Sequence, residues 1–334
     1  MPREAFYYES AGTELRCLLC PHNCIVQEGG GGICGVRKNR NGALVSEIYG
    51  EITSIAVDPI EKKPLYHFFP GSSVLSAGTK GCNLKCPYCQ NWSISQNLNS
   101  KTSSLKPHEL IRIALEQASP SIAYTYSEPG IWAEYVLEAG VLAKEAGIYN
   151  VLVTNGFINL KPLEDILSVA DAMNIDLKTF NENTFAQIHK GNLKHVLKTI
   201  EFVYNSSCHL EITTLAVTGI NDTMEDMRDI ISFIKGIDAS IPWHISRYFP
   251  AWKYNEPPTD PDFMTRVYDE ASQSLEFVYC GNLRGVNTGS DTFCPSCNNL
   301  IIKRSGFSSE IKSLNKVGKD ALCPECGRRL NILV

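Results

Sequence analysis

Two kinds of hydrophobic pattern alternate along the middle of the chain. Short runs rich in β-branched and aromatic residues recur between about positions 74 and 278, and stretches with a 3.6-residue apolar period separate them. This alternation predicts parallel strands joined by helical crossovers. The predicted strands are 74–78, 122–126, 150–154, 172–177, 209–217 and 243–248. Six such units predict an α/β fold with a partial, barrel-like (β/α)6 sheet.

The stretches between these strands carry the apolar stripes of amphipathic helices. In 131–146 a stripe made of Trp132, Tyr135, Ala139, Leu142 and Ala146 is predicted to face one way, and Glu134, Glu138 and Glu145 are predicted to face another. A second helix is predicted after an N-cap at Asp222 or Thr223, with a stripe made of Met227, Ile230, Ile231 and Ile234. We interpret both stripes as packing surfaces.

Composition supports a folded chain with a large core. The 334 residues are 43% hydrophobic and 20% charged, and the formal net charge of -5 argues against nucleic acid or an anionic membrane as a partner. The first ten residues lack the apolar run of a signal peptide, and no run of 18 apolar residues occurs. We therefore expect a cytoplasmic protein without a membrane segment.

The cysteines divide the chain into three predicted domains. There are 13 of them, mostly in CxxC-type groups, and in a reducing compartment such groups predict metal binding instead of disulfides. The predicted domains are an N-terminal cysteine-rich segment (1–70), the partial barrel (71–286) and a zinc-ribbon-like module (287–334). The two cysteines outside the groups, Cys208 and Cys280, are expected to be small buried hydrophobic residues.

Three cysteines between positions 78 and 92 carry the strongest chemical signal. Cys82, Cys86 and Cys89 stand at CxxxCxxC spacing, and one short loop can aim three such thiolates at three irons of a [4Fe-4S] cube. The fourth iron then stays open to chelate a small molecule. A zinc knuckle with a distant fourth ligand is the alternative, although zinc knuckles favour paired CxxC units.

This motif resembles the radical S-adenosylmethionine (SAM) superfamily. Residues 65–96, LYHFFPGSSVLSAGTKGCNLKCPYCQNWSISQ, and the later SEP segment are similar to the AmmeMemoRadiSam proteins, which are related to pyruvate formate-lyase activating enzyme. The resemblance extends over about residues 17–326. It implies a TIM-like radical SAM barrel and a [4Fe-4S] cluster whose open iron takes the amino and carboxylate groups of SAM. It also implies that adenine packs against Tyr88.

Ligands of parallel barrels bind where strands end, so polar residues at those ends are candidates for SAM contacts. Glu128 follows the second predicted strand, where a carboxylate could accept hydrogen bonds from a bound ammonium. Its Ser-Glu-Pro segment is similar to the end of the GGE-type motif of the superfamily, without the two glycines. The alternative is a surface glutamate at the start of a helix.

The third predicted strand ends in Val153-Thr154-Asn155-Gly156, which is similar to the DTNG segment of glycyl-radical activases. Val153 stands where those proteins have the aspartate of a monovalent-cation site, so we do not predict that ion. Thr154 and Asn155 are predicted to contact the polar end of SAM, and Gly156 to form the turn.

The fourth predicted strand carries three polar residues on one face, since Asn174, Asp176 and Lys178 alternate with apolar residues. Burial of these groups without partners would cost several kcal/mol. Each group must therefore hydrogen-bond to a ligand or to another of the three. The resemblance implies that Asp176 binds the hydroxyls of SAM, with Lys178 beside it. An internal Asp-Lys ion pair is the alternative.

The sixth predicted strand carries His244, and the resemblance implies that it lies near the adenosine; a satisfied structural histidine is the alternative. Glu211 on the fifth strand is a weaker candidate for SAM or substrate. Arg247 is either substrate-facing or half of a surface ion pair.

Both ends of the chain carry a further set of four cysteines. Cys17, Cys20, Cys24 and Cys34 could surround one structural zinc, and a second iron-sulfur cluster is the alternative. At the other end two CxxC knuckles predict a structural zinc, with a rubredoxin-like iron as the alternative. Those knuckles are formed by Cys294, Cys297, Cys323 and Cys326.

The resemblance implies a radical SAM oxidoreductase that cleaves SAM to methionine and a 5'-deoxyadenosyl radical, which abstracts hydrogen from a substrate. A protein or peptide substrate, as in glycyl-radical activases, is our first hypothesis, and a small metabolite is the second. A non-catalytic zinc or iron-sulfur protein that binds a partner or senses redox state is a more distant alternative. The implied partners are an electron donor such as flavodoxin or ferredoxin, and Memo-like and AMMECR-like proteins.

Overall fold

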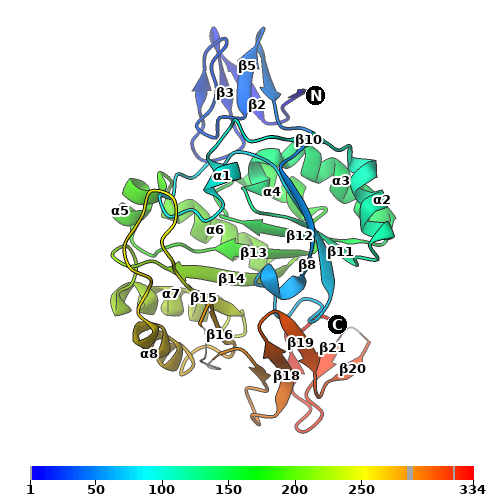
Figure 1. The fold of residues 1–334 in the computed structure, drawn as a ribbon, viewed down its shortest axis with the longest axis vertical. Coiled ribbons are helices and arrows are strands. Elements are labelled where there is room, and N and C mark those ends of the chain that lie inside the picture. Colours follow the sequence, from blue (N-terminus) through cyan, green and yellow to red (C-terminus); the bar gives the residue numbers. More distant parts are fainter. Residues whose placement is uncertain (1, 284–288, 319) are drawn as a thin grey trace.

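A curved eight-stranded sheet forms the centre of the computed structural model, which describes residues 2–283, 289–318 and 320–334 (Figure 1). The strands lie in the order β16-β15-β14-β13-β12-β11-β9-β8. Those from β9 to β16 run parallel, and β8 is antiparallel to β9. Their bounds are β8 (Ser54–Pro59), β9 (Ser73–Gly78), β11 (Ser121–Tyr124), β12 (Tyr149–Thr154), β13 (Ala172–Asp176), β14 (His209–Ala216), β15 (Trp243–Arg247) and β16 (Val278–Gly281).

The partial α/β barrel and its six predicted strands are confirmed, and the sheet gains one strand at each edge. β16 is only four residues long, which is too short for a periodic signal. β8 comes from the 1–70 segment and exposes both Ile55 and Val57, so its hydrophobic pattern does not alternate as that of a half-buried strand does.

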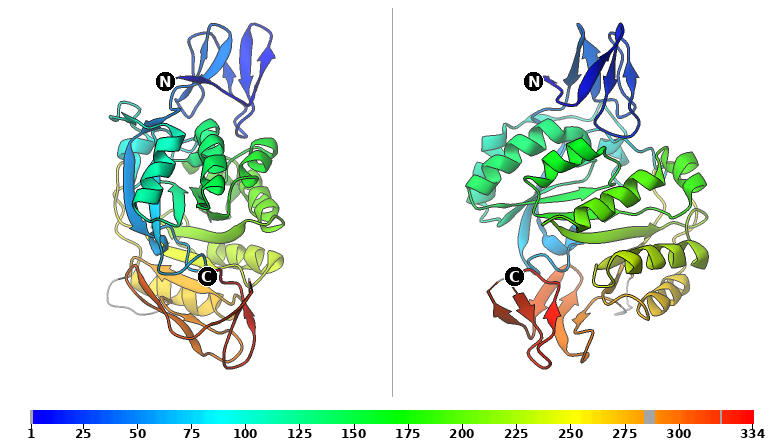
Figure 2. Two further views of the ribbon diagram at one scale, coloured as in Figure 1. Left: turned by 90° about the vertical axis from the view of Figure 1, so that its right-hand side faces the viewer. Right: turned by 180° about the vertical axis from the view of Figure 1, so that it is seen from behind.

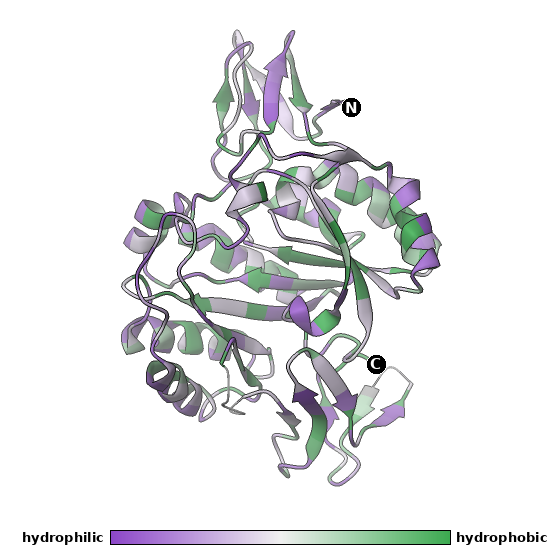
Figure 3. Ribbon diagram, viewed as in Figure 1, coloured by the Kyte–Doolittle hydropathy of each residue, from purple (hydrophilic) through white to green (hydrophobic). Residues whose placement is uncertain are grey.

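The main helices cover the outer face of this sheet (Figure 2). Apolar and polar residues alternate along them (Figure 3), and their buried residues are mostly apolar. As predicted, α7 begins after Thr223, whose side chain accepts a hydrogen bond from the backbone of Asp226. The helical elements are η1 (Ile60–Lys62), α1 (Trp92–Ser95), α2 (Pro107–Glu116), η2 (Pro129–Trp132), α3 (Ala133–Glu145), α4 (Leu160–Leu167), α5 (Glu182–Thr184), the π-helical η3 (Phe185–His189), α6 (Leu193–Tyr204), α7 (Met224–Ile237) and α8 (Pro261–Ala271).

The predicted orientation of α3 is wrong at two positions. Ala146 is exposed, and Glu134 is buried in an ion pair with Arg37, whose guanidinium nitrogens lie 2.7 and 3.1 Å from the carboxylate oxygens. The two side chains are 0% and 1% exposed. The partner lies 97 residues away in the N-terminal segment, so the helical periodicity alone could not reveal this pair.

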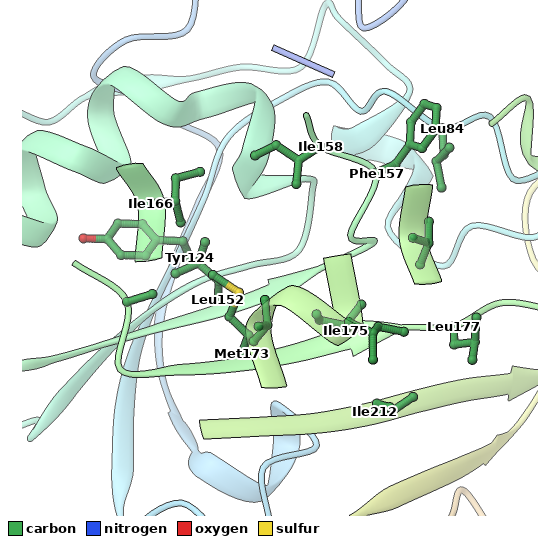
Figure 4. Close-up of a cluster of buried hydrophobic side chains, with 14 of the residues drawn as sticks. Leu84, Tyr124, Leu152, Phe157, Ile158, Ile166, Met173, Ile175, Leu177 and Ile212 are labelled. Carbon is green, nitrogen blue, oxygen red and sulfur yellow. The ribbon is translucent and has the colours of Figure 1, made fainter. Parts of the chain in front are cut away.

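Buried apolar side chains fill the space between the sheet and the helices (Figure 4). Leu152, Met173 and Ile175 come from the sheet, and Ile166 comes from α4. Leu84, which is 1% exposed, belongs to the cysteine loop after β9, and Figure 4 shows it beside Phe157. The cysteine loop is therefore anchored in the same core as the barrel.

The inner face of the sheet is filled from the amino ends of its strands by residues 60–69. Ile60, Leu65 and Phe68 pack against apolar residues of β9, β11, β12 and β13. Glu211 holds this segment, because its carboxylate accepts hydrogen bonds from the backbone N–H groups of Tyr66 (3.0 Å) and His67 (2.8 Å).

Two histidines complete the surroundings of Glu211. His209 and His244 place their Nε2 atoms 3.0 and 2.6 Å from its two oxygens. Burial would raise the pKa of Glu211, but the hydrogen bonds from both histidines outweigh it and hold the pKa well below its usual range. Glu211 is therefore a buried structural carboxylate in this structure.

Two small β modules lie at opposite ends of the barrel (Figure 1). The C-terminal module, 292–334, contacts the amino ends of the barrel strands, where Leu333 packs with Phe68 and Val74. The remaining strands are β1 (Arg3–Glu4), β2 (Tyr8–Ala11), β3 (Glu14–Cys17), β4 (Ile25–Val26), β5 (Arg37–Arg40), β6 (Ala43–Ser46), β7 (Glu51–Ile52), β10 (Ser103–Ser104), β17 (Thr292–Phe293), β18 (Leu300–Ser305), β19 (Ser308–Ile311), β20 (Asn315–Val317), β21 (Asp320–Leu322) and β22 (Arg329–Leu330). Within the described part of the chain, none of the helices combines the length and the apolar character needed to span a bilayer.

Replacement of the buried carboxylate should destabilise the fold. In Glu211→Gln one acceptor oxygen becomes a donor that faces N–H groups, so we expect the free energy of unfolding to fall by about 3 kcal/mol, as for a broken buried ion pair. Chemical denaturation checks this. Glu310→Gln is the matched control, because that side chain is 67% exposed and pairs with Lys312 at the surface. Equal denaturation midpoints for the two variants would contradict the assigned role of Glu211.

Candidate active site

The carboxyl ends of the parallel strands place the predicted site residues at one edge of the sheet. The loop that carries the three central cysteines follows β9, Glu128 follows β11, Asn155 follows β12, and Lys178 follows β13. Because β9, β11, β12 and β13 are neighbours in parallel register, these four loops lie next to one another.

Polar groups of the protein already surround the sulfurs of the cysteine loop. The Sγ of Cys82 accepts from the backbone N–H of Leu84 at 3.4 Å and from Nδ2 of Asn155 at 3.7 Å. The Sγ of Cys89 shares a hydrogen bond of 3.1 Å with the hydroxyl of Ser95 in α1. Hydrogen-bond donors near cluster sulfurs stabilise their negative charge and tune the reduction potential.

In this loop Cys86 is buried, and Cys82 and Cys89 are half-buried. Burial raises the pKa of Cys82 well above its usual range, with smaller contributions from Glu128 and Cys86. Burial also raises the pKa of Cys86 to about 11, although the nearby ammonium of Lys178 lowers it. Iron binding must displace these protons, and the donors and the cation then compensate the thiolate charge. The residues present thus fit an anionic iron-sulfur cluster.

Glu128 joins the loops after β11 and β12. Its Oε1 accepts from the N–H of Gly130 (2.8 Å) and the hydroxyl of Thr154 (2.7 Å), and its Oε2 accepts from the N–H of Asn155 (2.9 Å). Burial raises the pKa of Glu128 even though these three hydrogen bonds lower it. A carboxylate offers about four acceptor positions. One position therefore remains for a further donor such as an ammonium.

Asn155 and Asn83 connect the cysteine loop to β12. Nδ2 of Asn155 donates to Oδ1 of Asn83 at 2.9 Å, and Nδ2 of Asn83 donates to the carbonyl of Phe157 at 2.7 Å. Both asparagines are buried. This chain of amides fixes the residue next to Cys82 against the neighbouring strand end.

Asp176 and Lys178 form an ion pair of 2.9 Å between Oδ2 and Nζ, which is the alternative that the sequence left open. Burial disfavours the ammonium, but Asp176 and Cys86 more than offset this and raise the pKa of Lys178 well above its usual value. Oδ1 of Asp176 accepts no hydrogen bond from a described residue. Beside it in the sheet register, the hydroxyl of Thr213 is buried and has no partner within the described chain. A ligand with hydroxyl groups would satisfy both.

Tyr88, the predicted adenine contact, is buried, and its hydroxyl shares a hydrogen bond of 2.6 Å with Nε2 of His189. His189 ends the π-helical turn η3, and burial lowers its pKa to about 3, so the ring is neutral. The rings of Tyr248 and Tyr254 lie 6.3 Å from that of Tyr88. Tyr88 therefore belongs to an aromatic wall, and its contact with adenine stays a prediction.

The candidate residues of β15 lie away from the strand-end loops, His244 deeper in the barrel and Arg247 further out. His244 is buried against Glu211 and the ring of Tyr66, so its contact with adenosine also stays a prediction. Arg247 donates to the carbonyl of Thr259 at 2.7 Å and stacks over Phe249 at 5.0 Å. Asn174 donates to the carbonyl of Pro64 at 2.7 Å, on the side of the segment that fills the barrel.

Four residues with clear roles here were not predicted as site residues. Asn83 stands inside the CxxxCxxC motif, so its position between two ligands was an available signal. Thr213 alternates with Glu211 on β14 and could have been included by the same strand-end argument. Ser95 and His189 could not be found, because only the three-dimensional fold brings them to Cys89 and Tyr88.

The four C-terminal cysteines converge to form a second candidate metal centre. Their sulfurs all lie within 4.8 Å of one another, and the pairs Cys294/Cys326 and Cys297/Cys323 are 3.6 and 3.5 Å apart. Sulfurs about 2.3 Å from one tetrahedral ion lie about 3.8 Å apart, so this site suits a single zinc or iron. The choice between these metals stays a prediction.

The chain is similar to known proteins over its whole length. The profile of the Radical SAM superfamily matches residues 77–234. The uncharacterized protein MJ0808 of Methanocaldococcus jannaschii is 37% identical over 338 residues, which cover 99% of this chain and 100% of that protein. The putative glycyl-radical enzyme activating enzyme MJ1632 of the same organism is 27% identical and covers 71% of this chain and 88% of its own.

Solved structures share the fold. The crystal structure of Streptococcus suis SuiB bound to precursor peptide SuiA has a TM-score of 0.52 at 14% sequence identity, over 67% of this chain and 52% of that one. At this identity the likeness concerns the architecture of the barrel alone.

Removal of one thiolate should empty the cysteine loop. In Cys86→Ala only two protein ligands remain for the cluster, so we expect the loss of about four irons per chain and of all reductive SAM cleavage. Iron analysis after anaerobic reconstitution and chromatography of 5'-deoxyadenosine check this. Cys280→Ala is the control, because that cysteine is buried outside every cysteine group. A Cys86→Ala protein with unchanged iron content and turnover would show that the ligands lie elsewhere.

Loss of the carboxylates at the strand ends should weaken SAM binding without loss of iron. Asp176→Asn and Glu128→Gln each turn an acceptor into a donor, so we expect SAM affinity to fall on the order of tenfold, which corresponds to an unmet buried hydrogen bond. Titration of the reconstituted protein with SAM, followed by electron paramagnetic resonance, measures this. Asp165→Asn on α4 is the control. Wild-type affinity in both site variants would mean that SAM does not reach these residues.

Proposed function

This chain belongs to the radical SAM superfamily, and on that premise we propose that it abstracts hydrogen from a protein or peptide substrate, as a glycyl-radical activating enzyme does. Three strand-end loops, after β11, β12 and β13, that meet beside the CxxxCxxC loop are the observation that carries the proposal. Together with the cysteine loop they combine three thiols, a carboxylate with a spare acceptor position and a second carboxylate next to a buried hydroxyl.

When bound, the cluster and SAM together supply a 5'-deoxyadenosyl radical by one-electron cleavage of SAM. Cys82, Cys86 and Cys89 would hold the cluster. Glu128 would accept a hydrogen bond from the amino group of SAM, because it keeps one acceptor position beside its three protein donors. The protein supplies position, charge and exclusion of water.

Asp176 and Lys178 are suited to the sugar of SAM. Oδ1 of Asp176 accepts no hydrogen bond from the described chain, and the buried hydroxyl of Thr213 lies beside it in the register. The ammonium of Lys178 holds the other oxygen of Asp176 in place and also lies near Cys86. One cation thus compensates charge for both the sugar-binding carboxylate and the cluster loop.

A macromolecular substrate is supported by the surface around the barrel mouth. Trp92 follows the cysteine loop and Phe249 follows β15, and they are 40% and 38% exposed. Trp92 stacks on Trp252 with ring centroids 6.4 Å apart. Exposed aromatic side chains next to a reactive centre are typical of protein-binding surfaces. The C-terminal module does not cover this surface, because it contacts the opposite end of the barrel.

The similarity to MJ1632, a putative glycyl-radical enzyme activating enzyme, supports the proposal that this surface binds a protein substrate. An external one-electron donor of the flavodoxin or ferredoxin class would supply the electron, and Memo-like and AMMECR-like proteins are proposed as partners.

The test is to incubate the reconstituted, reduced protein and SAM with candidate glycyl-radical proteins encoded nearby. We expect a glycyl doublet in the electron paramagnetic resonance spectrum of one candidate, and no doublet when Cys86→Ala replaces the wild-type chain. Absence of a doublet with every candidate, together with deuterium transfer from a labelled metabolite into 5'-deoxyadenosine, would contradict the activase proposal and favour the small-metabolite alternative.

A further inference from the structure

The three cysteine groups of this chain differ in how tightly their sulfurs converge. The C-terminal four meet within 4.8 Å, as sulfurs around one ion do. Throughout the described ranges no other set of three or more Cys, His, Asp or Glu side chains brings its ligand atoms together so closely. The central cysteine loop and the N-terminal group, Cys17, Cys20, Cys24 and Cys34, are therefore both more open than a single-ion site.

The N-terminal cysteines nevertheless surround a common point. A Cβ placed on Gly32 would lie 3.6 Å from the Sγ of Cys24 and 3.8 Å from that of Cys34. Cys17, Cys20 and Cys34 are at most 9% exposed. The backbone N–H of Cys17 donates to the carbonyl of Cys24 at 2.9 Å, and Cys20 lies near the other three cysteines. The four mostly buried thiols therefore form a cage beside Gly32.

The width of this cage suits a polynuclear centre. In a [4Fe-4S] cube each thiolate binds its own iron, so the four sulfurs stand further apart than the roughly 3.8 Å expected around one tetrahedral ion. In the described chain the sulfurs of the central loop likewise do not meet within 4.8 Å of one another. That loop lies in the stretch that matches the Radical SAM superfamily. Within one structure, the N-terminal group thus resembles the cluster loop and differs from the C-terminal knuckles.

A buried cation lies beside this cage. Arg37 is 1% exposed, and its charge lies near the sulfurs of Cys17 and Cys34. Arg37 is itself held by Glu134 of α3. A fixed positive charge stabilises thiolates in a low-dielectric environment, and an anionic cluster needs such compensation.

The cage also contacts the cysteine loop of the active site. A Cβ on Gly81, the residue before Cys82, would lie 3.1 Å from the carbonyl oxygen of Cys34. Gly81 has φ +95, so only glycine fits this backbone and this close approach. Nε2 of His22, which stands between Cys20 and Cys24, lies 2.8 Å from the carbonyl of Asn83. The two cysteine groups are thus direct neighbours.

We propose that Cys17, Cys20, Cys24 and Cys34 bind a second [4Fe-4S] cluster, adjacent to the one in the central loop. All four irons of this cluster have a cysteine ligand, so it has no open iron for SAM. The assignment does not depend on the substrate or on the activase hypothesis.

The decisive experiment leaves the N-terminal residues unchanged. A triple variant, Cys82→Ala/Cys86→Ala/Cys89→Ala, cannot hold the first cluster, so any cluster in it must lie elsewhere. We expect acid-labile sulfide to fall from about eight per wild-type chain to about four in the triple variant. We also expect the reduced triple variant to give an electron paramagnetic resonance signal that SAM does not alter. Sulfide near zero, with two zinc ions bound per triple-variant chain, would overturn the proposal.

Two controls locate the cluster. Addition of Cys20→Ser to the triple variant should remove the remaining sulfide, whereas addition of Cys208→Ala should leave it at about four, because Cys208 is a buried cysteine outside all three groups. A mononuclear iron at the C-terminal knuckles contains no sulfide and is not counted in this assay. Retention of sulfide after the Cys20→Ser change would place the cluster elsewhere and overturn the proposal. SAM cleavage by the wild-type chain tests the proposed function separately.

Discussion

The parallel register of the barrel strands is the constraint on which the rest of the site depends. Hydrogen bonding between strands places Asp176 beside Thr213 and Thr154 beside Ile175. These positions do not depend on the conformation of the loops. Loops that follow neighbouring strands then meet at one edge of the sheet. Glu128 joins two of these loops through the three hydrogen bonds that it accepts. A shift by one residue in any of these pairings would turn the polar side chains toward the helices.

The sequence predicted what depends on local pattern. Buried parallel strands are nearly continuous apolar runs, so their ends, and the polar residues after them, could be located. Glu128, Asn155 and Asp176 were placed at strand ends in this way. The edge strands were missed because β16 is short and β8 exposes apolar side chains. The pairing of Glu134 with Arg37 could not be predicted, since it joins residues 97 positions apart.

The two ends of the barrel use buried charge in different ways. At the amino ends, Glu211 accepts four hydrogen bonds and ties residues 66 and 67 to β14 and β15. Its desolvation is costly, and the donors compensate that cost only in one arrangement, so the carboxylate specifies where the segment lies. At the carboxyl ends, Glu128 and Asp176 keep acceptor capacity unused by the described chain. The amino end of the barrel is therefore closed by its polar network, whereas the carboxyl end keeps acceptor groups available for a ligand.

The cysteine loop must be rigid although residues 79–91 contain no helix or strand. Backbone hydrogen bonds link it to separate segments: Lys85 donates to His189, Gly81 donates to Ile94, and Pro87 accepts from Lys253. Leu84 adds an apolar anchor in the core. An irregular loop of this length would otherwise lose about 1 to 2 kcal/mol of backbone entropy per residue when it is ordered around a cluster. Contacts within the protein offset part of that cost, so the free energy of metal binding does not have to supply all of it.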